Sequence, residues 1–112
     1  MSGKFEISAS SNGKFLFNLK ARNGQVILTS QLFDSLHHAV EAAQALQQDN
    51  KLADRIHRKV STAGEPYFSI HGDGDKVIAR SQMYSSNTAM EKGIDSVLEH
   101  APQALLVDTT AE

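Results

Sequence analysis

The five histidines are the first residues to consider for chemistry, because an imidazole can bind a metal ion or move a proton near neutral pH. They stand at His37, His38, His57, His71 and His100. His37 and His38 are adjacent in a predicted helix, so their side chains diverge by about 100° and cannot hold a metal as an i, i+4 pair does. The others lack partners at ligand spacing, and the chain contains no cysteine. The sequence therefore predicts solvated histidines, with neither a metal nor another cofactor.

Acidic and nucleophilic side chains give equally little support for catalysis. Asp73 and Asp75 flank Gly74 like the start of a calcium loop, but Tyr84 occupies the twelfth position, where an EF-hand requires Glu. A hairpin turn is the simpler interpretation of these residues. No serine lies in a G-x-S-x-G motif, and G-D-G-D-K-V lacks the third glycine of a dinucleotide-binding turn. We therefore expect a protein that is not an enzyme, and rank an enzyme as the third alternative.

Two polar pairs that recur at an offset of 51 residues are the candidate ligand or partner site. Ser30-Gln31 and Ser81-Gln82 each follow a predicted strand, and an aromatic residue (Tyr84 in the second copy) comes two residues later. One interpretation is that these side chains satisfy backbone groups where a strand leads into a helix, which is the more ordinary role. The alternative is a groove shared by the two copies. The sequence leaves both open.

The same offset relates residues 10–35 to residues 61–86 through eight identities. These are Ser10/Ser61, Gly13/Gly64, Phe17/Phe68, Val26/Val77, Ile27/Ile78, Ser30/Ser81, Gln31/Gln82 and Ser35/Ser86. Each copy is one supersecondary unit of about fifty residues, a size at which a separate core is marginal. The two copies are therefore expected to share a single core.

We predict one domain over the 112 residues of the chain. Repeat one is expected at about 4–54, repeat two at about 55–108, and a frayed tail at 109–112. The repetition predicts a pseudo-twofold arrangement, because two copies are too few for a solenoid.

Each copy predicts three strands, a helix and a fourth strand. Apolar and polar residues alternate in the strands, and Asn-Gly or Gly-rich turns separate them. Ser35 and Ser86 are the predicted N-caps of the helices, and Gly93 is expected to let the second helix approach the sheet closely. The segment around 53–60 is predicted to close the first copy and to open the second. The fold class is therefore α+β, with seven strands in one mainly antiparallel sheet and two packed helices.

The charge is unevenly distributed between the halves. Residues 1–60 hold eight Lys and Arg against five Asp and Glu, whereas residues 61–112 hold three against eight. The open face of the sheet is expected to carry basic side chains that could follow a phosphate backbone: Lys20, Arg22, Arg55, His57, Lys59 and Arg80. The alternative is a solvated face whose cations discourage edge pairing. Tyr67 is the one aromatic side chain expected on this face, whereas an RNA-recognition sheet presents several for base stacking.

The composition also bears on the compartment. Cysteine is absent, the first residues lack the apolar stretch of a signal peptide, and no apolar run approaches the roughly 20 residues that span a bilayer. We expect a soluble cytoplasmic protein with no membrane partner.

Three stretches resemble the YegP-like family of small uncharacterised bacterial proteins: NGKFLFNLKARNGQVILTSQLF, SQMYSSNTAMEKGIDSV and APQ. The resemblance implies repeated β3-α-β units that form one continuous sheet and exchange their C-terminal strands. Single-repeat members are homodimers, so this chain resembles a fused pseudo-dimer and is expected to be monomeric. The family brings no activity, ligand or cofactor. The first helix, SLHHAVEAAQAL, and the turn HGDGDK depart from the lysine-containing family pattern.

The sequence thus predicts a small binding or interaction module of unknown ligand, with a protein among the candidate partners. The alternative is a weak binder of nucleic acid or anions through the basic sheet face.

Overall fold

A computed structural model describes residues 3–72 and 76–110 of the chain. Within them the elements run in the order β1 (Lys4–Ala9), β2 (Phe15–Lys20), β3 (Val26–Ser30), α1 (Leu36–Gln48), β4 (Ile56–Val60), β5 (Pro66–His71), β6 (Val77–Arg80), α2 (Asn87–His100) and β7 (Leu105–Asp108). Two short 3-10 helices, η1 (Leu52–Arg55) and η3 (Ala101–Gln103), lead into β4 and β7. The predicted turn at 72–75 lies largely outside the described residues, as do Asp73 and Asp75.

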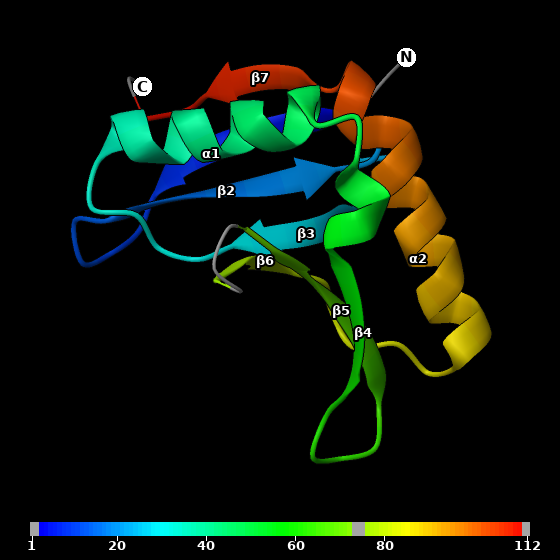
Figure 1. The fold of residues 1–112 in the computed structure, drawn as a ribbon. Helices are drawn as coiled ribbons and strands as arrows, with labels where there is room; N and C mark the ends of the chain where they lie inside the picture. The colour runs from blue at the N-terminus through cyan, green and yellow to red at the C-terminus, as the bar shows by residue number, and fades with distance from the viewer. Residues whose placement is uncertain (1–2, 73–75, 111–112) are drawn as a thin grey trace.

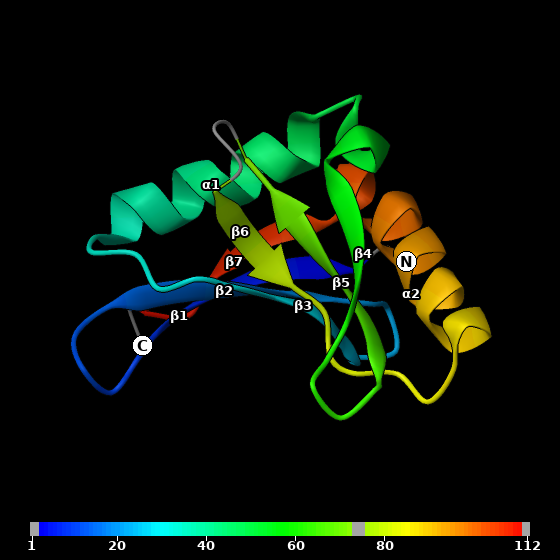
Figure 2. The same cartoon turned by 60° about the horizontal axis from the view of Figure 1, so that its bottom comes forward.

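The seven strands form one sheet in the order β4-β5-β6-β3-β2-β1-β7. All neighbouring strands are antiparallel except β1 and β7, which are parallel. The predicted α+β class with one mainly antiparallel sheet is therefore confirmed. Figures 1 and 2 show that the strands of the two halves cross steeply, with β3 and β6 between them.

The two repeats join through a short pairing of β3 with β6. Thr29 lies opposite Arg80 there, and these two residues are 51 positions apart, which is the repeat offset. Equivalent residues must pair in this way if a twofold axis passes between the two strands. The pseudo-twofold relation of the whole repeats remains a prediction.

The predicted double role of β4 is wrong in one respect. β4 opens the second repeat by pairing with β5, as β1 pairs with β2. On the other side of β4, however, no strand of the described residues is present, whereas in the first repeat β7 lies beside β1. The reason is geometric. Two four-stranded units require eight positions, the described residues supply seven strands, and β4 cannot lie beside itself.

Both helices begin as their sequences predict. The Ser35 Oγ accepts a hydrogen bond from the His38 amide at 3.1 Å, and the Ser86 Oγ accepts one from the Ala89 amide at 3.1 Å. These side chains satisfy one of the amide donors that a helix leaves unpaired in its first turn. α1 packs on β1 and β2, and α2 packs on β5 and β3.

One core contains residues of both repeats. Its largest fully buried side chains include Phe5, Phe17, Leu19, Phe68 and Ile70, which alternate with polar residues along their strands. Full burial of a side chain of this size contributes about 1.5–3 kcal/mol to folding. The two repeats therefore share one core, and the insufficiency of each repeat alone remains a prediction.

Candidate ligand-binding site

The repeated serines bind backbone groups at the ends of β3 and β6. Ser30 Oγ accepts a hydrogen bond from the Phe17 amide at 2.9 Å and donates one to the Gln31 carbonyl at 2.7 Å. Ser81 does the same with the Phe68 amide at 3.0 Å and the Gln82 carbonyl at 2.8 Å. Both serines are buried. Each hydroxyl proton is therefore engaged with the backbone, which agrees with the more ordinary of the two interpretations.

The aromatic residues that follow the polar pairs pack beneath the helices. The Phe33 ring is stacked on Phe17 with centroids 6.2 Å apart, and the Tyr84 ring is stacked on Phe68 at 6.2 Å. A Cβ atom added to Gly93 would lie 2.6 Å from Cζ of Tyr84, closer than van der Waals contact permits. Gly93 thus makes room for the phenol, and the predicted close approach of α2 is explained by this contact.

Tyr84 has a perturbed acidity. Burial raises the pKa of its hydroxyl, because the phenolate would lose solvation, and a hydrogen bond with the Gln82 side chain acts in the opposite direction. Tyr84 therefore remains a neutral phenol at physiological pH, and its hydroxyl is available only as a hydrogen-bonding group.

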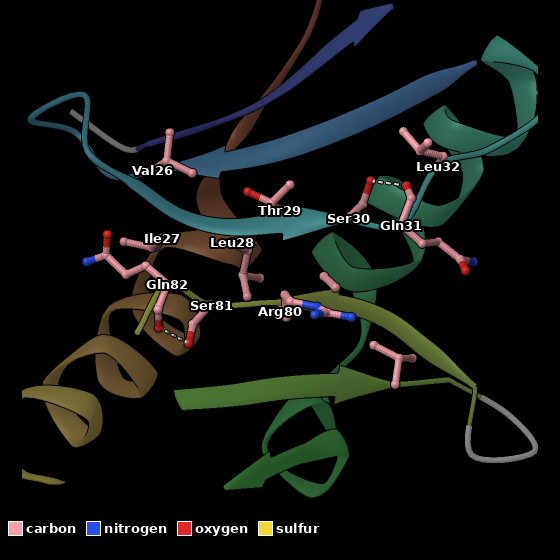
Figure 3. A pocket seen from close by; sticks show the side chains of 12 residues that line it. Val26, Ile27, Leu28, Thr29, Ser30, Gln31, Leu32, Arg80, Ser81 and Gln82 are labelled. Carbon is pink, nitrogen blue, oxygen red and sulfur yellow. Dashed lines mark hydrogen bonds between the residues drawn. The ribbon is translucent and has the colours of Figure 1, made fainter. Parts of the chain in front are cut away.

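A hollow of about 570 Å³ lies where β3 meets β6. It is lined by Val26, Ile27, Leu28, Thr29, Ser30, Gln31 and Leu32 from the first repeat and by Val77, Ala79, Arg80, Ser81 and Gln82 from the second. The exposed Thr29 and Arg80 alternate with buried neighbours, so they face away from the core and its helices. Figure 3 shows Gln31 and Gln82 at opposite ends of the hollow and Arg80 between them. The structure thus brings both polar pairs to one hollow.

Arg80 is the cation of this hollow. No acidic side chain of residues 3–72 and 76–110 forms an ion pair with it. The nearby Thr29 Oγ1 donates a hydrogen bond to the Asn18 side chain at 2.9 Å. A guanidinium presents a planar fork of donors that matches a carboxylate or phosphate. The hollow therefore combines one anion-binding group with the two glutamine amides.

The predicted basic face is divided between two sides of the sheet. Three of its members lie at outward strand positions: Lys20, Lys59 and Arg80. However, Lys20 Nζ forms an ion pair with Glu6 Oε1 at 3.0 Å. The same contact lowers the pKa of the Glu6 carboxyl through its hydrogen bond with Lys20. Part of the positive charge of this face is therefore neutralised.

Two other residues predicted for that face lie beside the helices instead. Arg22 is 3.9 Å from Glu99 of α2, and Arg55 Nε donates to Asp49 Oδ2 at 2.6 Å, just after α1 ends. Both lie in irregular backbone, Arg22 in a turn and Arg55 at the end of η1, where period-two alternation no longer specifies a side.

A further cluster on β4 and β5 was not evident from residue spacing. The rings of His57 and His71 are stacked with centroids 3.9 Å apart, and Ser69 Oγ lies 2.9 Å from His71 Nε2. Only the strand register, with His57 opposite Ser69, brings these residues together. Within the described part of the chain, no three His, Cys, Asp or Glu side chains are placed to hold a metal ion.

The fold and the duplicated junction define a class of tandem-repeat α+β proteins whose two units share one sheet and one core. Residues 10–55 and 61–108 each match the model of a family described as a domain of unknown function, DUF1508. The chain is 39% identical to a UPF0339 protein of Shewanella oneidensis over 98% of its length and 100% of that protein. It is 34% identical to the UPF0339 protein YegP of Escherichia coli, again over 98% of its own length and 100% of the relative.

Two solved structures are similar to this fold. The solution NMR structures of the Shewanella oneidensis protein and of Escherichia coli YegP both give a TM-score of 0.91. The identities are 39% and 34%, over 100% of this chain and 95% and 97% of those chains. The chain therefore belongs to the UPF0339, or YegP-like, family, as its motifs suggested. These relatives are proteins of unknown function. No helix of the described residues is long and apolar enough to cross a membrane.

Proposed function

We propose that this protein is a binding module whose ligand is a small organic anion held in the hollow between β3 and β6. The observation that carries the proposal is the exposed guanidinium of Arg80, which no described acidic side chain neutralises and which lies between Gln31 and Gln82. A volume of about 570 Å³ suits a ligand of metabolite size.

The lining indicates how such a ligand would be recognised. Arg80 would bind a carboxylate through two parallel hydrogen bonds, and the amides of Gln31 and Gln82 would bind polar groups further along the ligand. Val26 and Leu32, which are 36% and 47% exposed, would cover an apolar part. Both repeats contribute groups, so the complete site would require the tandem chain.

We propose binding without catalysis. The hydrogen bond between Ser69 and His71 joins a nucleophile type to a base type, but Ser69 is 1% exposed and closed to a substrate. Activated nucleophiles must be accessible to the reacting atom. We further propose that the protein acts as a monomer in the cytoplasm, a setting compatible with a cysteine-free chain.

The test is a titration of the isotopically labelled full chain with succinate, citrate and inorganic phosphate, followed by amide NMR. Binding should shift signals of residues 26–32 and 77–82, and Arg80→Gln should weaken it at least about tenfold through loss of a charged hydrogen-bonding partner. Arg80→Lys should recover only part of the affinity, because lysine lacks the fork.

Lys59→Gln is the matched control, since it removes an equal charge from the same face on β4. Equal weakening by Arg80→Gln and Lys59→Gln would show a diffuse charge effect and would reject the proposed site. Shifts confined to other residues, or no binding by any of the three probes, would do the same.

A second candidate is single-stranded nucleic acid along the open face. It is favoured by the outward positions of Lys20, Lys59 and Arg80 with Tyr67 opposite Lys59. This binding should weaken steeply with added salt and be lost when the three cations are neutralised together. A carboxylate bound in the hollow should instead depend on Arg80 alone.

A further inference from the structure

The outer edge of β4 differs from that of β1, its equivalent in the first repeat. β7 lies parallel to β1, with Leu105 opposite Lys4 and Asp108 opposite Ile7. The backbone of β7 is held by the Leu105 amide, which donates to the Gly3 carbonyl at 3.1 Å, and by the Thr109 amide, which donates to the Ile7 carbonyl at 3.0 Å. Among the described strands, none takes the corresponding position beside β4.

The backbone of β4 presents hydrogen-bonding groups toward that position. Arg58 lies opposite Phe68, whose amide donates to Ser81 Oγ and whose carbonyl accepts from the Ser81 amide at 2.8 Å. Phe68 therefore points its backbone groups toward β6, and Arg58 must point its own away from β5. Val60 lies opposite Pro66, which has no amide hydrogen to donate, so the backbone groups of Val60 also point away from β5.

A second hollow borders this edge. It has a volume of about 340 Å³ and is lined by Arg58, Lys59 and Val60 of β4 and by Asn87, Met90 and Glu91 of α2. In the first repeat, the equivalent part of β1 is bordered by β7, whose Asp108 lies opposite Ile7 and whose Leu106 lies opposite Phe5 and packs against the core. The hollow beside β4 is thus the space that the side chains of an added strand would fill.

The charges of the edge select among possible occupants. Arg58 and Glu91 form a salt bridge at 2.5 Å where the first repeat has Ile7 and Val40. A charge placed on the inner side of an edge strand opposes pairing with apolar strands and with a second copy of the same edge. The charge of Arg58 is balanced by Glu91, and Lys59, on the other side of the strand, is a cation without an ion pair to any described acidic side chain. A strand with the register of β7 would place the residue equivalent to Asp108 opposite Arg58.

We propose that the free edge of β4 binds an extended acidic peptide of a partner protein as an eighth strand, parallel to β4. Backbone hydrogen bonds to Arg58 provide affinity, as in other cases of strand addition. An acidic side chain opposite Arg58, at the hollow beside α2, and an apolar side chain two residues earlier, opposite Ile56, provide the specificity. This site is separate from the hollow at β3 and β6.

The test uses a capped synthetic peptide with the sequence of residues 104–110, ALLVDTT, which has the required order of apolar and acidic residues. Added to the labelled full chain, it should shift the amide signals of residues 56–60 and 87–91. A peptide with lysine in place of its aspartate should bind at least about tenfold more weakly, because its ammonium group would lie beside the guanidinium of Arg58. A peptide N-methylated at its first threonine should not bind, because that amide corresponds to the donor from Thr109 to Ile7.

Four results would overturn the proposal. The lysine peptide could bind as well as the parent, the shifts could fall on β1 because the peptide displaces β7, or no shift could occur at millimolar peptide. Concentration-dependent pairing of the chain through β4 without peptide would also overturn it, since the occupant would then be a second copy. Arg80→Gln should leave peptide binding unchanged, which separates this site from the anion site.

Discussion

The two outer strands of the first and second repeats, β1 and β4, begin from equivalent sequence positions and have different surroundings. β1 is covered by β7, and Ile7 is fully buried. β4 borders only β5 among the described strands, and its equivalent residue, Arg58, forms a salt bridge with Glu91. The comparison teaches that a duplicated unit changes its side chains where the shared fold leaves one copy without a neighbour.

A similar contrast beneath the helices gives the largest expected effect. The first repeat has Phe33 with Ala42, and the second has Tyr84 with Gly93 at the equivalent positions. Gly93→Ala should destabilise the protein by about 2 kcal/mol, because overpacking against the tyrosine outweighs the better helix propensity of alanine. Urea unfolding followed by circular dichroism measures the change.

The double variant Tyr84→Phe with Gly93→Ala recreates the pair of the first repeat and should recover part of that loss, because the hydroxyl contact is removed while the Cζ atom remains. Ala42→Gly is the matched control and should cost about 1 kcal/mol through helix propensity alone. Equal losses for Gly93→Ala with and without Tyr84→Phe would contradict the assigned contact.

The serines at the junction should show how alike the repeats are. Ser30→Ala and Ser81→Ala each leave the buried amide of a phenylalanine unpaired, at a cost of about 1–2 kcal/mol. We expect the two losses to agree within about 0.5 kcal/mol, since geometry and burial are nearly the same. A large difference in the unfolding free energies would show that the junctions are not energetically equivalent.

Replacing Arg58 and Glu91 by the apolar pair of the first repeat should change self-association more than it changes the unfolding free energy. Arg58→Ile with Glu91→Val should alter the unfolding free energy by less than about 1 kcal/mol, because the lost salt bridge is largely exposed. Removal of the inner charge should increase self-association, measured by sedimentation velocity over a range of concentrations. An unchanged sedimentation coefficient would argue against the protective role of this pair.

The smallest expected effect is on the titration of Glu91. The hydrogen bond with Arg58 lowers the pKa of this carboxyl below its usual value, so the folded state binds the proton less readily than the unfolded state. The pair therefore stabilises the fold above the unfolded pKa, and that contribution disappears as the pH falls through the lowered folded value. Carboxyl ¹³C NMR should show the pKa rising in Arg58→Met, whereas Lys14→Met should leave it unchanged.

Much of the fold could be predicted from local pattern. The duplication, the N-caps Ser35 and Ser86 and the close approach at Gly93 are all recorded in short stretches of sequence. The polar pairs at 30–31 and 81–82 were also identified as candidates. What the sequence did not specify was how strands pair across the sheet.

The stacking of His57 on His71 depends on the register of β4 with β5, which no spacing along the chain reveals. The positions of Arg22 and Arg55 beside the helices depend on irregular backbone, where residue periodicity carries no information. The uncovered edge of β4 follows from the number of available strands, a property of the whole sheet rather than of any segment.

The pairing of β1 with β7 also affects how the protein is made. It joins Lys4 to Leu105, nearly the full span of the chain, so the first strand must wait for the last before its outer side is covered. Contacts this distant in sequence slow folding, and an exposed strand on a growing chain is open to aggregation. During synthesis, the outer edge of β1 is therefore unprotected until β7 has left the ribosome.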